Sequence, residues 1–325
     1  MTGGRTRPSR IDVHAHYLPD DYRSAALAAG EQHPDGMPAL PEWSEAAALA
    51  LMDKLSIRTA MLSISSPGVH YGDDRAAREL ARSCNRQGCE LVRKHRGRFG
   101  LFAALPLPDI AGSISEAIHA LDELGADGVT IETNHGGLYL GDPALDPLMQ
   151  VLDRRRAVVF VHPTSPGCGG CLGLAFGQPR PIIEFIFETT RAITDMIYHR
   201  TLERFPGIRV IVPHAGAALP VVAQRIADQA HNLDIDPPLT REDVFGTLRA
   251  LHYDLAGSPI PTLARALLDI ADPGRIHYGS DWPFTPGDNA VKLADAIDGA
   301  DLFDDALRQR ILFDNARDLF PRLKR

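Results

Sequence analysis

Short apolar runs recur along this chain, and segments with the periodicity of amphipathic helices lie between them. Gly, Pro, Asp or Ser residues bound the runs, as is typical of buried strands that end in turns. The runs predict strands at residues 11–16, 60–65, 100–105, 128–133, 158–162, 208–214, 250–255 and 276–281. The intervening segments that predict helices include residues 43–55, 74–95, 114–124, 145–155, 183–205, 219–231 and 260–270.

Strand and helix alternate eight times along the chain, which predicts an α/β fold. Parallel strands joined by right-handed helical crossovers close into a (β/α)8 TIM barrel, and a chain of 325 residues fits a single domain of this kind. We expect residues 11–325 to form the barrel. Residues 1–10, with Arg5, Arg7 and Arg10, are expected to be a disordered N-terminal tail.

The composition excludes several classes of protein. The chain is 44% hydrophobic and 23% charged, with a formal net charge of −8. It contains no apolar run of roughly 20 residues and no basic stripe, so we expect neither a membrane protein nor a nucleic-acid-binding surface. Four cysteines without a secretory signal predict reduced thiols and a cytoplasmic location. Cys168 and Cys171 are spaced like a redox or zinc pair but lack a second pair, so ordinary thiols are the better interpretation.

His14 and His16 are the first candidates for chemistry. Side chains two residues apart on a strand point to the same side, so both imidazoles can bind one metal ion. Imidazole is a good ligand for zinc and related metals at neutral pH. By itself the pair favours two ordinary histidines at a strand end over a metal site.

Further polar residues fall at the carboxyl ends of other predicted strands. They are His162 on the fifth strand, His214 on the sixth, Asp254 on the seventh and Asp281 on the eighth. In a parallel barrel these ends meet at one mouth, where active sites are built. A core role explains any one of these residues well, but it explains their joint position poorly. The chain therefore predicts a metal centre at the barrel mouth.

The motifs around these residues resemble the amidohydrolase superfamily. They are Ile-Asp-Val-His-Ala-His at 11–16, Val-His-Pro at 161–163, Pro-His-Ala-Gly at 213–216 and Gly-Ser-Asp-Trp-Pro-Phe at 279–284. More narrowly, the chain is similar to the decarboxylase branch, which includes the aminocarboxymuconate semialdehyde and γ-resorcylate decarboxylases. Stretches at 63–69, 102–108, 137–143 and 162–166 are most similar to the 6-methylsalicylate decarboxylases of that branch.

The resemblance implies one divalent metal ion with four ligands, His14, His16, His162 and Asp281. We expect Zn²⁺, with Mn²⁺ as the alternative. His214 is implied to lie beside the metal, and it and Asp281 are the two candidates for delivering a proton. Glu188 and Asp254 match family positions near the site, where they are expected to orient the ligands or His214 through hydrogen bonds.

Other residues are candidates for contact with the substrate. Trp282 and Phe284 can stack on an aromatic ring, although packing at the barrel rim is an equal alternative. His70 and Asn134 lie in loops that we expect to wall the substrate site. Arg225 matches an arginine that reaches the neighbouring subunit's site in related decarboxylases, which implies a homodimer; a solvated helix arginine is the alternative.

The sequence also bears on metal count and on substrate charge. Strand four offers no lysine of the kind that bridges two metals in many amidohydrolases, which favours one metal, although Glu132 is open to either a bridging or a structural role. The aminocarboxymuconate enzyme has a substrate-binding arginine after strand one, whereas residues 43–53 contain none. A small aromatic acid with a single carboxylate is therefore the expected substrate.

Two enzymatic functions follow from this reading. The first is a metal-dependent non-oxidative decarboxylase of an ortho-hydroxybenzoate such as 6-methylsalicylate, which gives 3-methylphenol and CO2. The alternative is a metal-dependent hydrolase of a lactone or cyclic ester that uses a metal-bound hydroxide. A barrel that binds a ligand without catalysis is disfavoured because every type of metal ligand is present.

Overall fold

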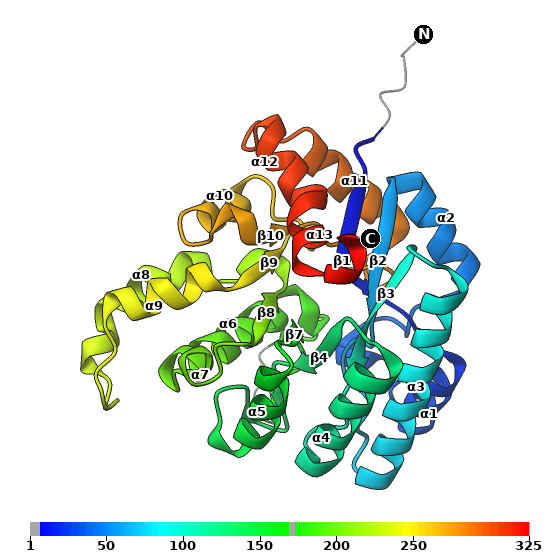
Figure 1. Ribbon diagram of the computed structural model, residues 1–325, viewed down its shortest axis with the longest axis horizontal. Coiled ribbons are helices and arrows are strands. Elements are labelled where there is room, and N and C mark those ends of the chain that lie inside the picture. The colour runs from blue at the N-terminus through cyan, green and yellow to red at the C-terminus, as the bar shows by residue number, and fades with distance from the viewer. Residues whose placement is uncertain (1–6, 169–172, 174, 325) are drawn as a thin grey trace.

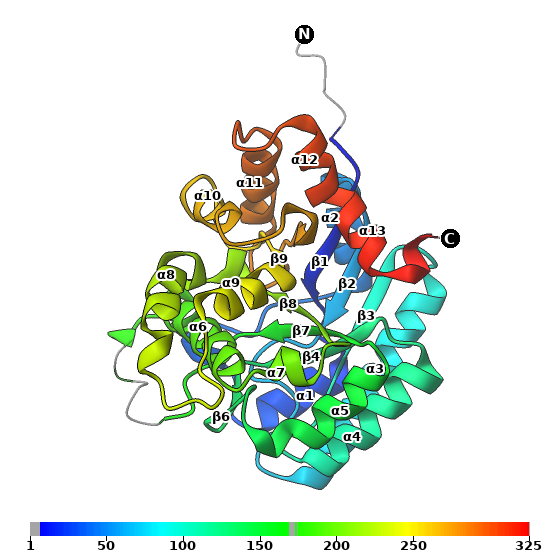
Figure 2. The same cartoon turned by 60° about the vertical axis from the view of Figure 1, so that its left-hand side comes forward.

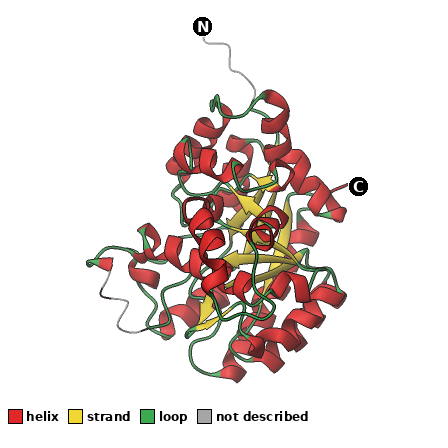
Figure 3. Ribbon diagram, turned by 90° about the vertical axis from the view of Figure 1, so that its left-hand side faces the viewer, coloured by secondary structure: helices red, strands yellow, loops and turns green. Residues whose placement is uncertain are grey.

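The computed structural model describes residues 7–168, 173 and 175–324. Eight parallel strands follow one another around a barrel, and helices cover the outside (Figure 1; Figure 3). The strands are β1 (Arg10–His16), β2 (Ile57–Ser63), β3 (Phe99–Ala104), β4 (Gly128–Glu132), β7 (Val158–His162), β8 (Arg209–Val212), β9 (His252–Asp254) and β10 (Ile276–His277). The predicted (β/α)8 barrel is confirmed, and each of the eight strands overlaps its predicted range.

Backbone hydrogen bonds between β1 and the segment after β10 close the barrel. The amide of Val13 donates to the carbonyl of Tyr278 at 2.9 Å, and the amide of His16 donates to that of Trp282 at 2.8 Å. In return, the amide of Asp281 donates to the carbonyl of His14 at 2.7 Å. The predicted eighth strand, 276–281, is thus regular only at Ile276–His277, yet its last residues are still bonded to β1.

The helices confirm the predicted segments and add several that the periodicity did not indicate, among them α1, α9 and α11. They are α1 (Asp20–Ala28), α2 (Glu45–Leu55), α3 (Asp74–Lys94), α4 (Ile110–Ile118), α5 (Asp146–Arg154), α6 (Glu184–Tyr198), α7 (Thr201–Arg204), α8 (Leu219–Gln229), α9 (Arg241–Ala250), α10 (Thr262–Leu268), α11 (Gly287–Asp298), α12 (Asp305–Gln309) and α13 (Asn315–Leu319). Side-chain caps set several starts: Asp73 accepts from the Ala76 amide at 2.7 Å where α3 begins.

Two apolar layers hold the barrel together. The larger one lies between the strands and the helices and includes Leu62, Leu101 and Leu248. The smaller one fills the barrel interior, where the rings of Phe102 and Phe160 stack with their centroids 5.3 Å apart. The C-terminal segment packs on this inner layer, since α13 contacts β1 and β10 (Figure 2) and Phe320 lies 5.8 Å from Phe102.

A register shift in β1 lets one strand serve both the inner layer and the barrel mouth. Ile11 and Val13 belong to the inner apolar layer, whereas His14 and His16 occupy the opposite set of alternating positions and still face the interior. The pairing of β1 with β2 shifts between Asp12 and Ala15, which changes the side toward which later side chains point. The irregularity therefore aims both histidines inward.

The N-terminal boundary differs from the prediction. β1 begins at Arg10, which is fully buried and donates to Asp298 at 2.9 Å, and Arg7 also pairs with Asp295 and Asp298. These ion pairs order residues that we expected to be a disordered tail; residues 1–6 lie outside the described part of the chain.

Not all of the described cysteines are free thiols. Cys84 and Cys89 are free and buried, but Cys168 is disulfide-bonded, which contradicts the expectation of four reduced thiols; Cys171 lies outside the described residues. None of the helices in the described ranges is long and apolar enough to cross a bilayer. The cytoplasmic location and the lack of a nucleic-acid partner stay predictions.

We expect Phe320→Ala to lower the free energy of unfolding by about 3–5 kcal/mol, because it empties part of the inner layer beneath the mouth. Denaturant unfolding followed by circular dichroism measures the loss. Phe176→Ala is the matched control, since that ring is 81% exposed and its removal should change stability by less than about 0.5 kcal/mol. Equal losses in the two variants would contradict the role given to the inner layer.

Candidate metal centre and substrate cavity

Four potential ligands from three parts of the chain converge at the barrel mouth. His14 and His16 come from β1, His162 ends β7, and Asp281 follows β10. One ligand atom from each lies within 4.8 Å of all the others. The three imidazoles are buried, with at most 2% of each residue exposed. The structure thus brings together the four residues that the sequence predicted as ligands.

Hydrogen bonds on the far side of each ring fix its orientation. In each histidine Nδ1 is engaged by a neighbour, which leaves Nε2 to face the centre. The partners are Asp254 Oδ2 for His14 at 2.9 Å, Ser63 Oγ for His16 at 2.9 Å and the Pro163 carbonyl for His162 at 2.8 Å. These contacts hold the three Nε2 atoms toward one point.

Asp281 turns its two carboxylate oxygens to different neighbours. Oδ1 lies 3.3 Å from His14 Nε2 and 3.1 Å from His16 Nε2. Oδ2 lies 3.6 Å from His214 Nε2. The residue adopts a φ of 58°, which is unusual for a non-glycine residue and aims the carboxylate between the two histidine groups. One carboxylate therefore connects the predicted ligands to His214.

The charges of the centre favour a cation. Burial alone would lower the pKa of His14, but the Asp254 and Asp281 carboxylates outweigh burial and raise it to about 10. Burial lowers the pKa of His16, and burial together with its histidine neighbours lowers that of His162 well below the usual range. Although burial opposes it, the surrounding histidines hold the pKa of Asp281 well below its ordinary value. At neutral pH Asp281 is therefore ionised and the His16 and His162 imidazoles are neutral, whereas His14 holds a proton between the Asp254 and Asp281 carboxylates that a metal ion would displace.

This donor set fits a single divalent metal ion. Within the described residues His14 Nε2 is buried and its one polar neighbour, Asp281 Oδ1 at 3.3 Å, does not form a hydrogen bond of good geometry, which is costly for a polar atom unless something else binds it. Three imidazole nitrogens and one carboxylate are typical ligands of zinc and its neighbours. Glu132, which the sequence left open as a bridging ligand, lies outside the cluster; a Cβ atom on Gly68 would be only 2.7 Å from its Oε1.

His214 is placed by strained backbone beside the cluster. It begins the turn η6 (His214–Gly216), and His214, Ala215 and Ala217 all have positive φ. The amide of His214 donates to Asp254 Oδ1 at 3.0 Å, so the carboxylate that holds His14 also holds this turn. Gly257 lies against the ring, since a Cβ atom there would be 3.1 Å from His214 Cδ2. Asp254 therefore has the orienting position that the sequence predicted for it.

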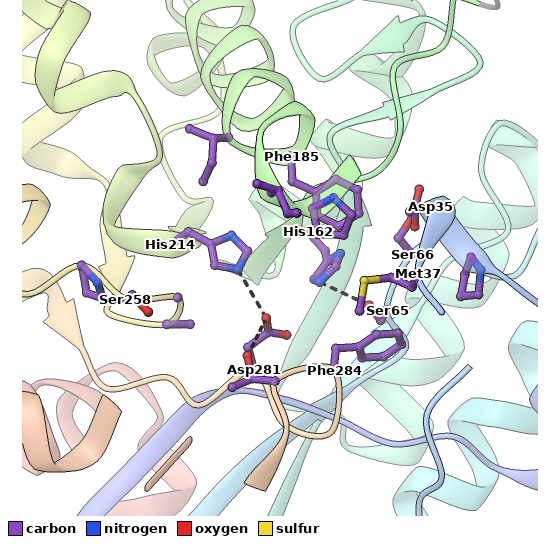
Figure 4. Close-up of a pocket in the computed structure, with 18 of the residues that line it drawn as sticks. Asp35, Met37, Ser65, Ser66, His162, Phe185, His214, Ser258, Asp281 and Phe284 are labelled. Atoms are coloured by element: carbon purple, nitrogen blue, oxygen red, sulfur yellow. Dashed lines mark hydrogen bonds and ion pairs between the residues drawn. The ribbon is translucent and has the colours of Figure 1, made fainter. Parts of the chain in front are cut away.

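A cavity of about 420 Å³ opens next to the cluster (Figure 4). Its walls are mostly apolar, and Phe284 is one of them, as predicted; its ring also meets His16 edge-on at 5.3 Å. The lining residues from the predicted set are His162, His214, Asp281 and Phe284. Ser66, in the predicted loop after the second strand, also lines the cavity, whereas Asp35, Phe185 and Leu263, which sequence reasoning missed, carry no motif and come from parts far apart in the chain.

Four expected site residues lie elsewhere. Trp282 is not among the residues that line the cavity; it packs against the outer apolar layer, and its carbonyl is bonded to the His16 amide of β1. His70 bonds to Asp74 at 2.9 Å. His70 and Asn134 line a separate cavity of about 290 Å³.

Glu188 is the fourth expected site residue that lies away from the cavity. It is fully buried, but its hydrogen bonds go to Asn134, Tyr139 and Arg191 rather than to a ligand or to His214. It fastens a two-stranded hairpin, β5 (Asn134–His135) and β6 (Leu138–Tyr139), to α6. The prediction that Glu188 orients the metal ligands is therefore corrected.

The fold and donor set define a class of protein, a parallel barrel with a four-residue cluster suited to one metal ion at the carboxyl ends of its strands. More specifically, the chain belongs to the amidohydrolase family, whose model matches residues 11–322. The sequence-based identification of that superfamily is confirmed.

Known proteins share the whole length of this chain. The 6-methylsalicylic acid decarboxylase of Aspergillus aculeatus is 37% identical, with 97% of each chain covered. A crystal structure named amidohydrolase II is 35% identical and superposes with a TM-score of 0.90 over 98% of this chain and 100% of that one. A dihydroxybenzoic acid decarboxylase from Polaromonas, solved with manganese and 2-nitroresorcinol, shares the fold at 23% identity, with 98% of each chain covered and a TM-score of 0.82.

We expect Asp254→Asn to weaken divalent metal binding about 10- to 100-fold, because the neutral amide no longer holds the His14 ring as a charged acceptor. Titration of metal-free protein against a competing chelator measures the affinity. Asp269→Asn, at an exposed position, is the control and should bind metal like the parent chain. Unchanged affinity in Asp254→Asn would show that Asp254 does not support the centre.

Proposed function

We propose that this chain is a metal-dependent non-oxidative decarboxylase of a small ortho-hydroxybenzoate, with 6-methylsalicylate as the model substrate. The observation that carries the proposal is the cluster of His14, His16, His162 and Asp281 at the edge of an apolar cavity of about 420 Å³. The 6-methylsalicylic acid decarboxylase of Aspergillus aculeatus, similar over its full length, supports the same reaction class. No observation favours a lactone hydrolase.

The ionised cluster and the apolar walls would bind different parts of the substrate. His14, His16, His162 and Asp281 would hold a divalent ion, which when bound supplies a Lewis acid for the carboxylate and phenolate oxygens of the substrate. The ring would then lie against apolar side chains such as Phe284 and Phe185. Because no lysine or arginine of the described chain lines the cavity, a substrate with one carboxylate fits better than a dicarboxylate.

His214 and Asp281 are the groups that would handle the proton. Decarboxylation breaks the bond between the ring and the carboxylate, and the ring carbon takes up a proton as CO2 leaves. Asp281 Oδ2 and His214 Nε2 are 3.6 Å apart and both line the cavity, so a proton can reach the ring through this pair. We propose that the pair acts together, with Asp281 also serving as a ligand.

For the metal we propose Zn²⁺, with Mn²⁺ as the alternative. Three imidazole nitrogens and a carboxylate suit zinc, whereas the structurally similar decarboxylase from Polaromonas holds manganese. Metal analysis of protein prepared without added metal, followed by reconstitution with each ion, distinguishes them.

We also propose a homodimer in which Arg225 reaches the neighbouring subunit's site. Arg225 lies on α8, is exposed and has no hydrogen-bond partner among the described residues. Val221, one turn earlier, is 73% exposed, and Ile182, Ile183 and Phe187 add further exposed apolar side chains. Apolar residues of this number at the surface are typical of a contact between proteins.

We expect protein loaded with metal to convert 6-methylsalicylate to 3-methylphenol and CO2 in equal amounts, and a chelator to abolish the reaction until metal is restored. Gas release and chromatography of the phenol measure both products. A panel of ortho-hydroxybenzoates that gives no CO2, together with a lactone that is opened, would replace the proposal with hydrolysis.

His162→Ala should lose both metal and activity, because a ligand is removed. His214→Asn should keep the metal but lower kcat about 10²- to 10⁴-fold, since only proton transfer is impaired. Metal content and steady-state rates separate the two outcomes, and His231→Asn, at an exposed position, is the control. Full activity of His214→Asn would exclude it from the proton pathway.

Mixing inactive variants tests the shared site. If Arg225 serves the partner, His162→Ala and Arg225→Ala subunits mixed in equal amounts and allowed to exchange should recover about a quarter of the activity of the parent dimer. Half of the dimers are then mixed, and one of their two sites has both its ligands and an arginine. Light scattering gives the oligomeric state, and a mixture that stays inactive after proven exchange contradicts the role of Arg225.

A further inference from the structure

Asp35 places a carboxylate in the wall of the substrate cavity, away from the metal centre. It lies in the turn η1 (Pro34–Gly36), between α1 and α2, and only 6% of the residue is exposed. Figure 4 shows it on the opposite side of the pocket from His214 and Ser258, beyond Ser65 and Ser66. No motif or family position in the sequence pointed to this residue.

Its contacts hold one oxygen firmly and leave the other open. Asp35 Oδ1 accepts hydrogen bonds from the amide of Ser165, at 3.2 Å, and from its hydroxyl. Arg180 Nε donates in turn to that hydroxyl, so the turn is tied to the loop after β7. Among the described residues no group donates to Oδ2, and the nearby Arg180 guanidinium reaches Asp35 through the Ser165 hydroxyl and not by a direct ion pair. The φ of 54° is one that Asp and Asn tolerate better than most residues.

The other polar groups that line the cavity show why the unbonded Oδ2 of Asp35 matters. Ser66 Oγ is bonded to Thr164 Oγ1 at 2.7 Å, and Ser65 Oγ lies 3.3 Å from His162 Nε2. Among the described residues that line the cavity, Asp35 and Asp281 are the acidic ones, and none is Lys or Arg. The cavity therefore has two different ends: the metal end would bind the anionic groups of a substrate, and the Asp35 end offers a hydrogen-bond acceptor.

We propose that Asp35 is a specificity-determining residue that selects hydroxybenzoates with a second hydroxyl group on the ring edge remote from the carboxylate, such as 2,4-dihydroxy-6-methylbenzoate. The inference rests on the proposed decarboxylase function and names its substrate class more closely. A phenolic hydroxyl donates a charge-assisted hydrogen bond to Oδ2, whereas a second carboxylate at that edge meets a buried like charge. A bare ring edge leaves the acceptor unpaired, which also weakens binding.

The test compares substrates within each variant, so that the intrinsic reactivity of each ring cancels. We measure kcat/KM for 2,4-dihydroxy-6-methylbenzoate and for 6-methylsalicylate in the parent protein and in Asp35→Asn. The ratio of the two should fall at least tenfold in Asp35→Asn, because the amide keeps the turn and the Ser165 contacts but lacks the charge. Turnover of 2-hydroxyterephthalate, which carries a remote carboxylate, should rise at least tenfold in the same variant. Asp305→Asn, whose side chain is fully exposed, should leave both ratios unchanged.

A binding measurement separates this inference from the proposed function. Calorimetry of metal-loaded protein with 5-methylresorcinol and with 3-methylphenol needs no turnover, and only the resorcinol should bind at least tenfold more weakly to Asp35→Asn. If no benzoate is decarboxylated but this difference appears, the proposed function fails and Asp35 keeps its selective role. Ratios and affinities that are the same in the parent and in Asp35→Asn overturn the inference, provided that metal content and melting temperature show the variant to be folded.

Discussion

The geometry of the mouth depends on one buried carboxylate, that of Asp254. Its Oδ2 holds the His14 ring at 2.9 Å, while Oδ1 accepts from the amides of His214 at 3.0 Å and Ala256 at 2.9 Å. Although burial raises the pKa of Asp254, the charges of His14 and His214 and these hydrogen bonds bring it below the ordinary value. A single ionised group thus fixes a ligand on β1 and the turn after β8. Removing its charge would leave buried donors without an acceptor.

The strained backbone around the site is stable only because the barrel beneath it is rigid. Asp281, His214 and Ala215 all adopt left-handed conformations that cost energy for non-glycine residues. Barrel closure between β1 and the segment after β10 holds the first, and the Asp254 contact holds the others. The aromatic inner layer supports both, since Phe160 meets the His14 ring edge-on at 4.8 Å. Phe160 therefore both fills the inner layer and supports the His14 ring at the barrel mouth.

Charged and apolar groups are also separated along the cavity, starting from the metal end. Charge is concentrated where His14, His16, His162 and Asp281 converge, apolar side chains form the middle, and the Asp35 carboxylate stands at the far side. A small aromatic acid has the same sequence of features, with its anionic groups at one end and a ring beyond. The match is one of electrostatics as much as of size.

The sequence by itself determined the barrel and the residues that cluster at its mouth. Eight apolar runs predict parallel strands, and parallel strands must end at one mouth, so polar residues at those ends, His162 and Asp281 among them, had to converge. Loop contacts could not be predicted this way, because the path of a loop depends on packing between distant segments. Glu188 bonds to a hairpin and Trp282 packs at the barrel rim. Asp35 lies in the cavity wall, where it is bonded to Ser165, 130 positions later in the chain. Strand ends obey the local periodicity of the chain, but only the tertiary structure decides which loop residues meet.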